Sequence, residues 1–98
     1  MEEEILRLYS GGGYGEVPME RVLIILPRPQ IIRLPGAPDG IAGLISFEDG
    51  LIAARYLDGA ARKDSFECAV IVSGTGDGRW GILADEITGG GQIDSVYR

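Results

Sequence analysis

Glycine and proline interrupt this chain at short intervals, and their spacing limits it to short strands and turns. Sixteen glycines and five prolines are spread over 98 residues, with short apolar runs between them. Strands of about four to eight residues bounded by turn residues fit this pattern better than long periodic helices. We therefore predict an all-β fold, a small barrel or sandwich, in a single domain spanning residues 1–98.

Three segments carry the clearest strand signals. Val22–Leu26 is a continuous apolar run, which predicts a short strand buried on both faces. Phe66–Ser73 alternates strictly, which is typical of a strand with one apolar face, and Cys68 lies on that face as a small core residue. The third segment contains Trp80, Ile82 and Ala84, which are expected to share one face of a strand. Leu83 and Ile87 are expected to share its other face.

A β-hairpin is predicted over Gly43–Leu57, where Gly43–Phe47 and Leu51–Leu57 flank the turn Glu48-Asp49-Gly50. Gly50 is expected to supply the positive φ of that tight turn. One or two short helical turns are expected after prolines, at Met19–Val22 and Pro38–Ile41. Further strands are expected at Ile5–Tyr9 and Gln92–Tyr97.

Composition excludes several classes of function. The formal net charge is −6 with a single lysine, which opposes binding to the phosphates of nucleic acid or anionic lipid. The chain has no histidine and one cysteine, so it lacks a Ser-His or Cys-His pair and an internal disulfide. The acidic start and the absence of a long apolar run predict a cytoplasmic protein without membrane insertion.

Two glycine clusters and one acidic pair invite chemical interpretations that their contexts do not favour. Gly74–Gly78 and Gly11–Gly15 resemble phosphate-binding loops, but neither is followed by the lysine and helix that such loops need, so both are predicted as turns. Asp85 and Glu86 are adjacent and point to opposite sides of a strand, which opposes a paired acid–base role. We predict no catalytic residue, no metal site and no cofactor.

Two blocks of the sequence carry a recognisable combination of motifs. The first is Leu34–Leu57, with Pro35-Gly36-Ala37-Pro38, Gly43, Ile45, Ile52 and Leu57 in the informative positions. The second is Cys68-Ala-Val-Ile-Val, a glycine turn, and Gly81-Ile-Leu-Ala-Asp-Glu-Ile87. Together they resemble the CheW-like domains, the adaptor modules of bacterial chemotaxis arrays, and Ile5–Val22 is similar in kind. The resemblance implies two small barrels side by side and binding to a chemoreceptor or to the regulatory domain of a histidine kinase.

The chain departs from that family pattern in two respects. Glu48-Asp49 stands where the family usually has Arg-Gly, and Ala53 and Tyr56 replace a proline and an aspartate. Family members also continue through further strands and a closing helix. The expected fold is therefore a CheW-like small β-barrel with an incomplete second barrel. An open strand edge, at Gln92–Tyr97 or Phe66–Ser73, is predicted to pair with a second copy.

The function that the sequence predicts is a non-catalytic adaptor or scaffold. Arg55, on an otherwise apolar strand, is expected to be an edge residue or a buried ion-pair partner, and Trp80 a core residue or an interface anchor. The candidate contact residues are Ile45, Phe47, Glu48, Asp49, Arg55 and Trp80. The candidate structural residues are Pro35, Gly36, Pro38, Gly43, Gly50, Gly81 and Asp85. The alternatives are a stand-alone oligomeric module, an enzyme with a small-molecule groove, and a nucleic-acid-binding barrel.

Overall fold

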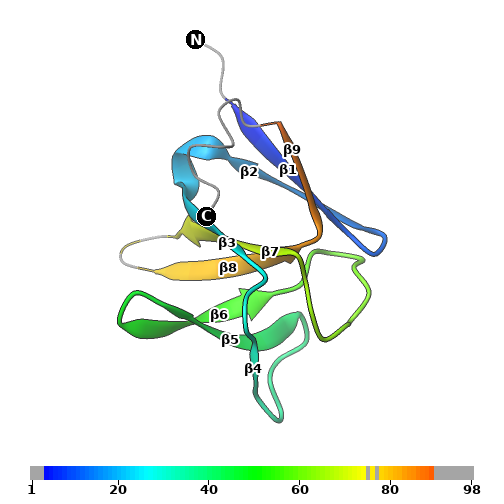
Figure 1. The fold of residues 1–98 in the computed structure, drawn as a ribbon, viewed down its shortest axis with the longest axis vertical. Helices are drawn as coiled ribbons and strands as arrows, with labels where there is room; N and C mark the ends of the chain where they lie inside the picture. Colours follow the sequence, from blue (N-terminus) through cyan, green and yellow to red (C-terminus); the bar gives the residue numbers. More distant parts are fainter. Residues whose placement is uncertain (1–3, 75, 77, 90–98) are drawn as a thin grey trace.

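The structure is a computed structural model that describes residues 4–74, 76 and 78–89, and these residues form nine strands and one 3-10 turn (Figure 1). The predicted strand Gln92–Tyr97 lies outside the described residues. The strands are β1 (Ile5–Ser10), β2 (Gly13–Pro18), β3 (Val22–Pro27), β4 (Ile32–Arg33), β5 (Ile41–Phe47), β6 (Gly50–Arg55), β7 (Cys68–Ser73), β8 (Arg79–Ala84) and β9 (Glu86–Gly89). The 3-10 turn is η1 (Met19–Arg21), which confirms the first expected helical turn.

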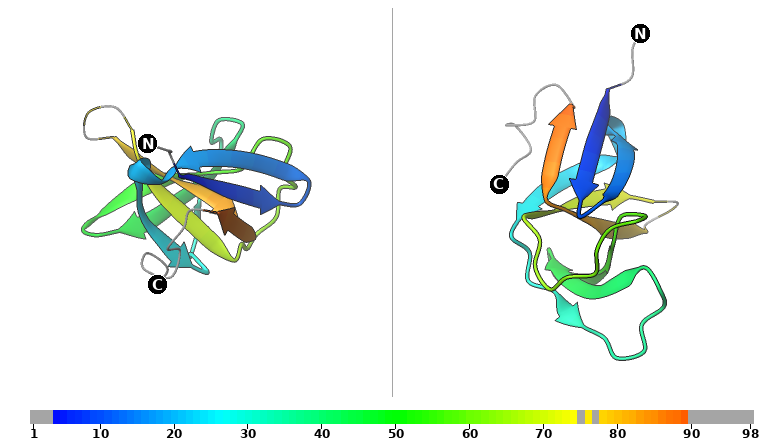
Figure 2. Two further views of the ribbon diagram at one scale, coloured as in Figure 1. Left: turned by 90° about the horizontal axis from the view of Figure 1, so that it is seen from above. Right: turned by 90° about the vertical axis from the view of Figure 1, so that its right-hand side faces the viewer.

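The strands form two sheets. A three-stranded sheet has the order β2-β1-β9, and a six-stranded sheet has the order β3-β7-β8-β6-β5-β4. Neighbouring strands are antiparallel except for β6 and β8, which are parallel. The three-stranded sheet lies on the side of β3, β7 and β8, while β5 and β4 lie at the opposite end of the molecule (Figures 1 and 2). The all-β prediction is confirmed.

Two hydrophobic cores share the central strands. The first lies between the two sheets and contains Leu6, Leu8, Cys68, Val70 and Val72, each at most 2% exposed. The second lies on the other face of the six-stranded sheet, where partly buried side chains of β3, β5 and β6 pack against it. Its buried members are Ala42, Ile45, Ala54, Phe66, Ala69, Ile71 and Leu83. Side chains on both faces of β7 are buried, so this strand contributes to both cores.

The predicted burial of β3 and β7 was wrong, because burial depends on where each strand lies in its sheet. β3 was expected to be buried on both faces, but it is an edge strand in which only Ile25 is fully buried and Leu23 is 44% exposed. β7 was expected to be half buried, but it lies between β3 and β8 and all its residues from Cys68 to Val72 are buried. An apolar run and an alternating run do not reveal which strand takes the centre of the sheet.

Three local predictions also need correction. Pro38–Ile41 forms a hydrogen-bonded turn instead of a helical turn, with the Ile41 N–H donating to the Pro38 carbonyl at 3.1 Å. The hairpin β5–β6 is confirmed, but its positive φ of 55° belongs to Glu48 and not to Gly50. Leu83 and Ile87 were expected to share one face, but Leu83 lies in the second core and Ile87 packs against the first, because the chain passes from the large sheet to the small one at Asp85.

The edges of the sheets bear on self-association. β7 pairs on both sides, so the expected pairing of Phe66–Ser73 with a second copy is wrong. Among the described residues the free edges belong to β2 and β9 in the small sheet and to β3 and β4 in the large one. Within residues 4–74, 76 and 78–89, no helix is long and apolar enough to cross a membrane.

Candidate docking surface

Reactive side chains do not converge anywhere in the described part of the chain. No three acidic or cysteine side chains of these residues cluster in a way that would hold a metal ion. Cys68 is 2% exposed, and its Sγ lies 3.5 Å from the Ala84 carbonyl oxygen. Burial, and to a lesser extent the charges of Asp85 and Glu67, raises the pKa of the Cys68 thiol to about 12. The thiol is therefore protonated at neutral pH and is a poor nucleophile.

This burial predicts that Cys68 resists alkylation in the native protein. At pH 8 we expect iodoacetamide to label the wild-type chain at least about 100-fold more slowly than the same chain in denaturant, because only opened molecules expose a thiolate. Mass spectrometry of timed samples measures the rate. Rapid labelling without denaturant would contradict the buried placement of Cys68.

Asp85 joins three segments of the chain at the junction of β8 and β9. Its Oδ2 accepts a hydrogen bond from the Ser10 hydroxyl at 2.8 Å, and its Oδ1 accepts one from the Glu67 N–H at 3.1 Å. Lys63 Nζ lies 2.5 Å from Oδ2. Burial alone raises the pKa of the carboxyl, but the contacts with Lys63, Ser10 and Glu67 outweigh it and hold the pKa below its ordinary value. The carboxylate is engaged by these neighbours within the protein.

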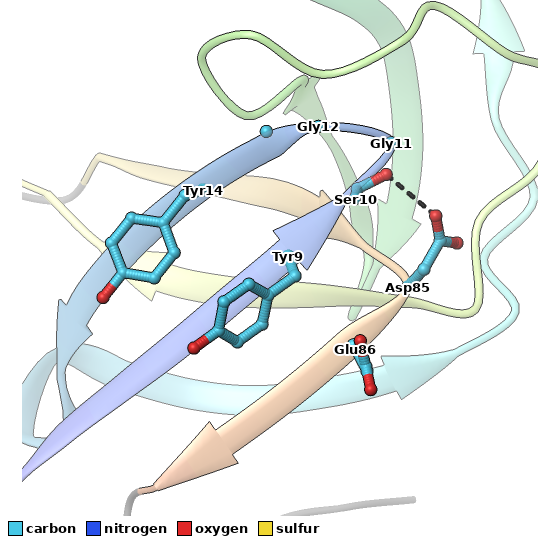
Figure 3. A pocket seen from close by; sticks show the side chains of 8 residues that line it. Tyr9, Ser10, Gly11, Gly12, Tyr14, Asp85 and Glu86 are labelled. Carbon is cyan, nitrogen blue, oxygen red and sulfur yellow. Dashed lines mark hydrogen bonds between the residues drawn. The ribbon is translucent and has the colours of Figure 1, made fainter.

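A glycine-lined depression lies beside Asp85, at the turn between β1 and β2 (Figure 3). Only Gly11 and Gly12 form the turn, because Gly13 already begins β2. Tyr9 and Tyr14 lie side by side on adjacent strands, with ring centroids 5.2 Å apart, and Glu86 lies opposite Tyr9 on β9. The depression contains one hydroxyl beside a carboxylate, the Ser10–Asp85 pair, but Ser10 is 3% exposed and the Asp85 carboxylate is also bound by Lys63 and the Glu67 N–H.

The other half of the large sheet has a face that neither core covers. Directly opposite residues of adjacent strands point to the same side of a sheet. The register joins Ile32 to Leu44, Leu44 to Ala53, and Ala53 to Trp80. Ile32, Leu44 and Ala53 belong to neither core. The three-stranded sheet does not lie over their strands β4, β5 and β6 (Figure 1). We call the group Ile32, Leu44, Leu51 and Ala53 the open sheet face.

Trp80 and Arg55 border the open sheet face. Trp80 is half-buried and packs against the first core. The Arg55 guanidinium lies 5.2 Å from the centre of the Trp80 ring, and the Arg21 guanidinium lies 5.6 Å from it. Arg55 is exposed on β6, which lies between β8 and β5, so it is neither an edge residue nor a buried ion-pair partner. Arg21 also donates two hydrogen bonds to the Ser73 carbonyl, at 3.0 and 2.6 Å.

The tip of the β5–β6 hairpin forms a second small group of exposed polar residues. Glu48 Oε1 accepts a hydrogen bond from Arg79 Nη1 at 2.7 Å, and the Arg79 guanidinium lies 5.6 Å from the Phe47 ring centre. Asp49 is exposed beside them and has no cation within 4.0 Å among the described residues. The hairpin tip therefore presents one free carboxylate to solvent.

The predicted contact residues separate into three groups. Phe47, Glu48 and Asp49 lie at the hairpin tip, and Arg55 and Trp80 lie together beside the open sheet face. Ile45 is 1% exposed inside the second core, so its side chain is not available to a partner and its assignment as a contact residue is corrected. Sequence reasoning missed Ile32 and Leu44. Leu51 and Ala53 were detectable, because they share one side of β6 with Arg55.

The residues predicted to be structural differ in what surrounds them. Pro35, Gly36 and Pro38 lie in the turns before β5, and Gly36 has a φ of +76°. A Cβ on Gly43 would lie 2.2 Å from the Ile32 carbonyl oxygen, and one on Gly81 would lie 2.8 Å from Ile45 Cδ1. Gly50 has open space around it and no positive φ, so its expected conformational role is wrong.

The arrangement defines a class of protein, a small all-β module in which two cores share central strands. The sequence matches no protein-family model and no curated protein. Among solved structures, the chain is similar to the crystal structure of the scaffolding protein TtCheW from Thermoanaerobacter tengcongensis, with a TM-score of 0.73 and 18% identity. The likeness covers 90% of this chain and 63% of that protein, so the chain spans less than two thirds of its length. The fold is therefore CheW-like, as the sequence motifs predict.

Proposed function

We propose that this chain is a non-catalytic adaptor of a chemotaxis-like signalling system, in the cytoplasm, that binds a chemoreceptor or the regulatory domain of a histidine kinase. The observation that carries the proposal is the CheW-like fold over 90% of the chain. The described residues also bring together exposed apolar and charged side chains without a catalytic pair, which fits docking better than chemistry.

A titration of purified components tests this function. We expect the chain to bind a receptor signalling-tip fragment or a kinase regulatory domain in isothermal titration calorimetry. Asp49→Arg reverses the free charge of the hairpin tip, and we expect it to change the Kd about tenfold in low salt, with a smaller change at high salt. Asp49 is preferred over Glu48 for this test because Glu48 is paired with Arg79.

Glu20→Arg is the matched control, because it makes the same charge change at an exposed position on η1. The absence of binding to both partners would contradict the adaptor function. Equal affinity and equal salt dependence for Asp49→Arg and the wild type would exclude the hairpin tip as a contact and leave the adaptor function to the other surfaces.

A stand-alone oligomeric module is the second candidate, and the free edges of the small sheet favour it. In the described part of the chain, β2 and β9 each pair on one side only, and unpaired edges recruit further strands. Sedimentation at high concentration separates the two candidates. A monomer that binds the receptor or kinase fragment supports the adaptor, whereas a stable oligomer without such binding supports the module.

A further inference from the structure

The open sheet face is an exposed apolar surface that the rest of the described chain leaves uncovered. Ile32 and Leu51 are 49% and 55% exposed, and the half-buried Leu44 and Ala53 lie between them on the same side of β5 and β6. On β8 the same row of opposed residues continues through Trp80 and on β7 through Val72, which the small sheet covers. One apolar row thus passes from a covered half to an uncovered half of a single sheet. Contiguous exposed apolar surface of this kind marks interaction sites.

The charges beside this face indicate what would cover it. Five cations, Arg7, Arg33, Arg62, Lys63 and Arg79, have a carboxylate within 4.0 Å. No carboxylate of a described residue lies that close to Arg21, Arg28 or Arg55, although the net charge of the chain is −6. Of these three, the guanidinium groups of Arg21 and Arg55 lie against Trp80, at the border of the apolar row. Two uncompensated cations in an acidic protein complement a partner that brings carboxylates to this border.

We propose that the open sheet face binds an acidic amphipathic segment of another protein. Apolar side chains of that segment cover Leu44, Leu51 and Ala53, and its carboxylates pair with the guanidinium groups at Trp80. The proposal rests on the docking function proposed above and adds to it the surface and the chemistry of the partner.

A second copy of this chain fits the face less well. A copy would bring its own uncompensated guanidinium groups and further apolar side chains to the same place, and these cations would repel one another. In an antiparallel pair, the hairpin-tip carboxylate Asp49, at the opposite end of β6 from Arg55, would bring only one carboxylate towards the two guanidinium groups of the other copy. Self-association through this face therefore stands as an outcome that would overturn the proposal.

An unbiased peptide selection tests the proposal. A displayed library of random 16-residue peptides is selected on the wild-type chain, and the enriched sequences are compared with the unselected library. We expect enrichment of Asp and Glu together with Leu, Ile and Phe. We also expect binding of a selected peptide to weaken about tenfold or more in Leu51→Glu and in Arg55→Glu, since each change places a carboxylate in the contact. Chemical shifts of the wild-type amides locate the peptide on β5 and β6.

Two matched variants control for unspecific effects. Leu23→Glu makes the same change at a 44% exposed leucine of the edge strand β3, and Arg28→Glu makes it at another exposed arginine without a close carboxylate among the described residues. We expect both to bind the selected peptide like the wild type, and circular dichroism to show that all four variants fold. The proposal would be overturned if the selection enriched only neutral or basic peptides, or none. It would also be overturned if Leu51→Glu bound the selected peptide like the wild type, or if the wild type formed a dimer that Leu51→Glu dissociates.

The outcome is separable from that of the proposed function. If the receptor and kinase fragments do not bind but acidic peptides are enriched on the open sheet face, the inference holds and the adaptor function fails. If a fragment binds equally to the wild type, Leu51→Glu and Arg55→Glu, and the selected peptides carry no acidic bias, the adaptor function holds and the inference fails.

Discussion

Gly43→Ala is expected to lower the free energy of unfolding by about 3 kcal/mol, at the upper end of the usual cost of inserting a methyl group into a packed site. The added Cβ would lie 2.2 Å from the Ile32 carbonyl oxygen and 2.9 Å from its carbonyl carbon. These are backbone atoms, so no side-chain rotation relieves the clash. β4 must move away from β5, to which it is joined only at Ile32–Leu44 and Arg33–Gly43. Urea denaturation followed by tryptophan fluorescence measures the loss.

Gly50→Ala is the matched control for this prediction. A Cβ at Gly50 would meet no atom within 4 Å, and the residue has no positive φ. We expect its stability to stay within about 0.5 kcal/mol of the wild type. Both glycines were predicted to be structural, and the structure distinguishes them by the atoms that surround the position of an added Cβ. Equal denaturation midpoints for the two variants would contradict the close approach of β4 to Gly43.

The sequence predicted the strands well because their signals are local. Glycine and proline positions delimited β1, the β5–β6 hairpin and the 3-10 turn η1, and the two motif blocks identified the CheW-like fold. The order of strands in the sheet is not local. β3 and β7 are paired at Ile25–Val70, yet β3 lies at the edge of the sheet and β7 lies inside it. The residues of the two strands do not indicate this difference in position.

The candidate site was predictable in part. Arg55 and Trp80 were singled out by residue type and alternation, and the structure brings them together because β6 and β8 are parallel neighbours with Ala53 opposite Trp80. Ile45 was misassigned because alternation within the hairpin does not say which face is covered. Ile32 was missed because its two-residue strand is too short to give a periodic signal. Positive φ at Glu48 in place of glycine also has no signature in the sequence.

Asp85→Asn is expected to lower the free energy of unfolding by about 2 kcal/mol at pH 7, the scale of hydrogen bonds to a charged group. The Lys63 side chain is 44% exposed, so its ion pair alone contributes little. The larger part comes from Ser10, which is 3% exposed and whose hydroxyl donates to the carboxylate, and from the Glu67 N–H. The asparagine keeps one oxygen acceptor for these two donors. Thermal and urea denaturation of both proteins measure the difference.

The pH dependence of this difference identifies its cause. The pKa of Asp85 is lowered in the folded state, so its ionised form stabilises the fold above the unfolded pKa of about 3.9, and this contribution is lost as the pH falls through the folded pKa. The gap between the wild type and Asp85→Asn should therefore be constant from about pH 5 to pH 7 and narrow below about pH 4. Glu86→Gln, at the exposed neighbouring position, should match the wild type within about 0.5 kcal/mol throughout. A gap that persists unchanged at pH 2 would show that Asp85→Asn acts through packing, and that the charge of Asp85 does not hold the junction of the two sheets together.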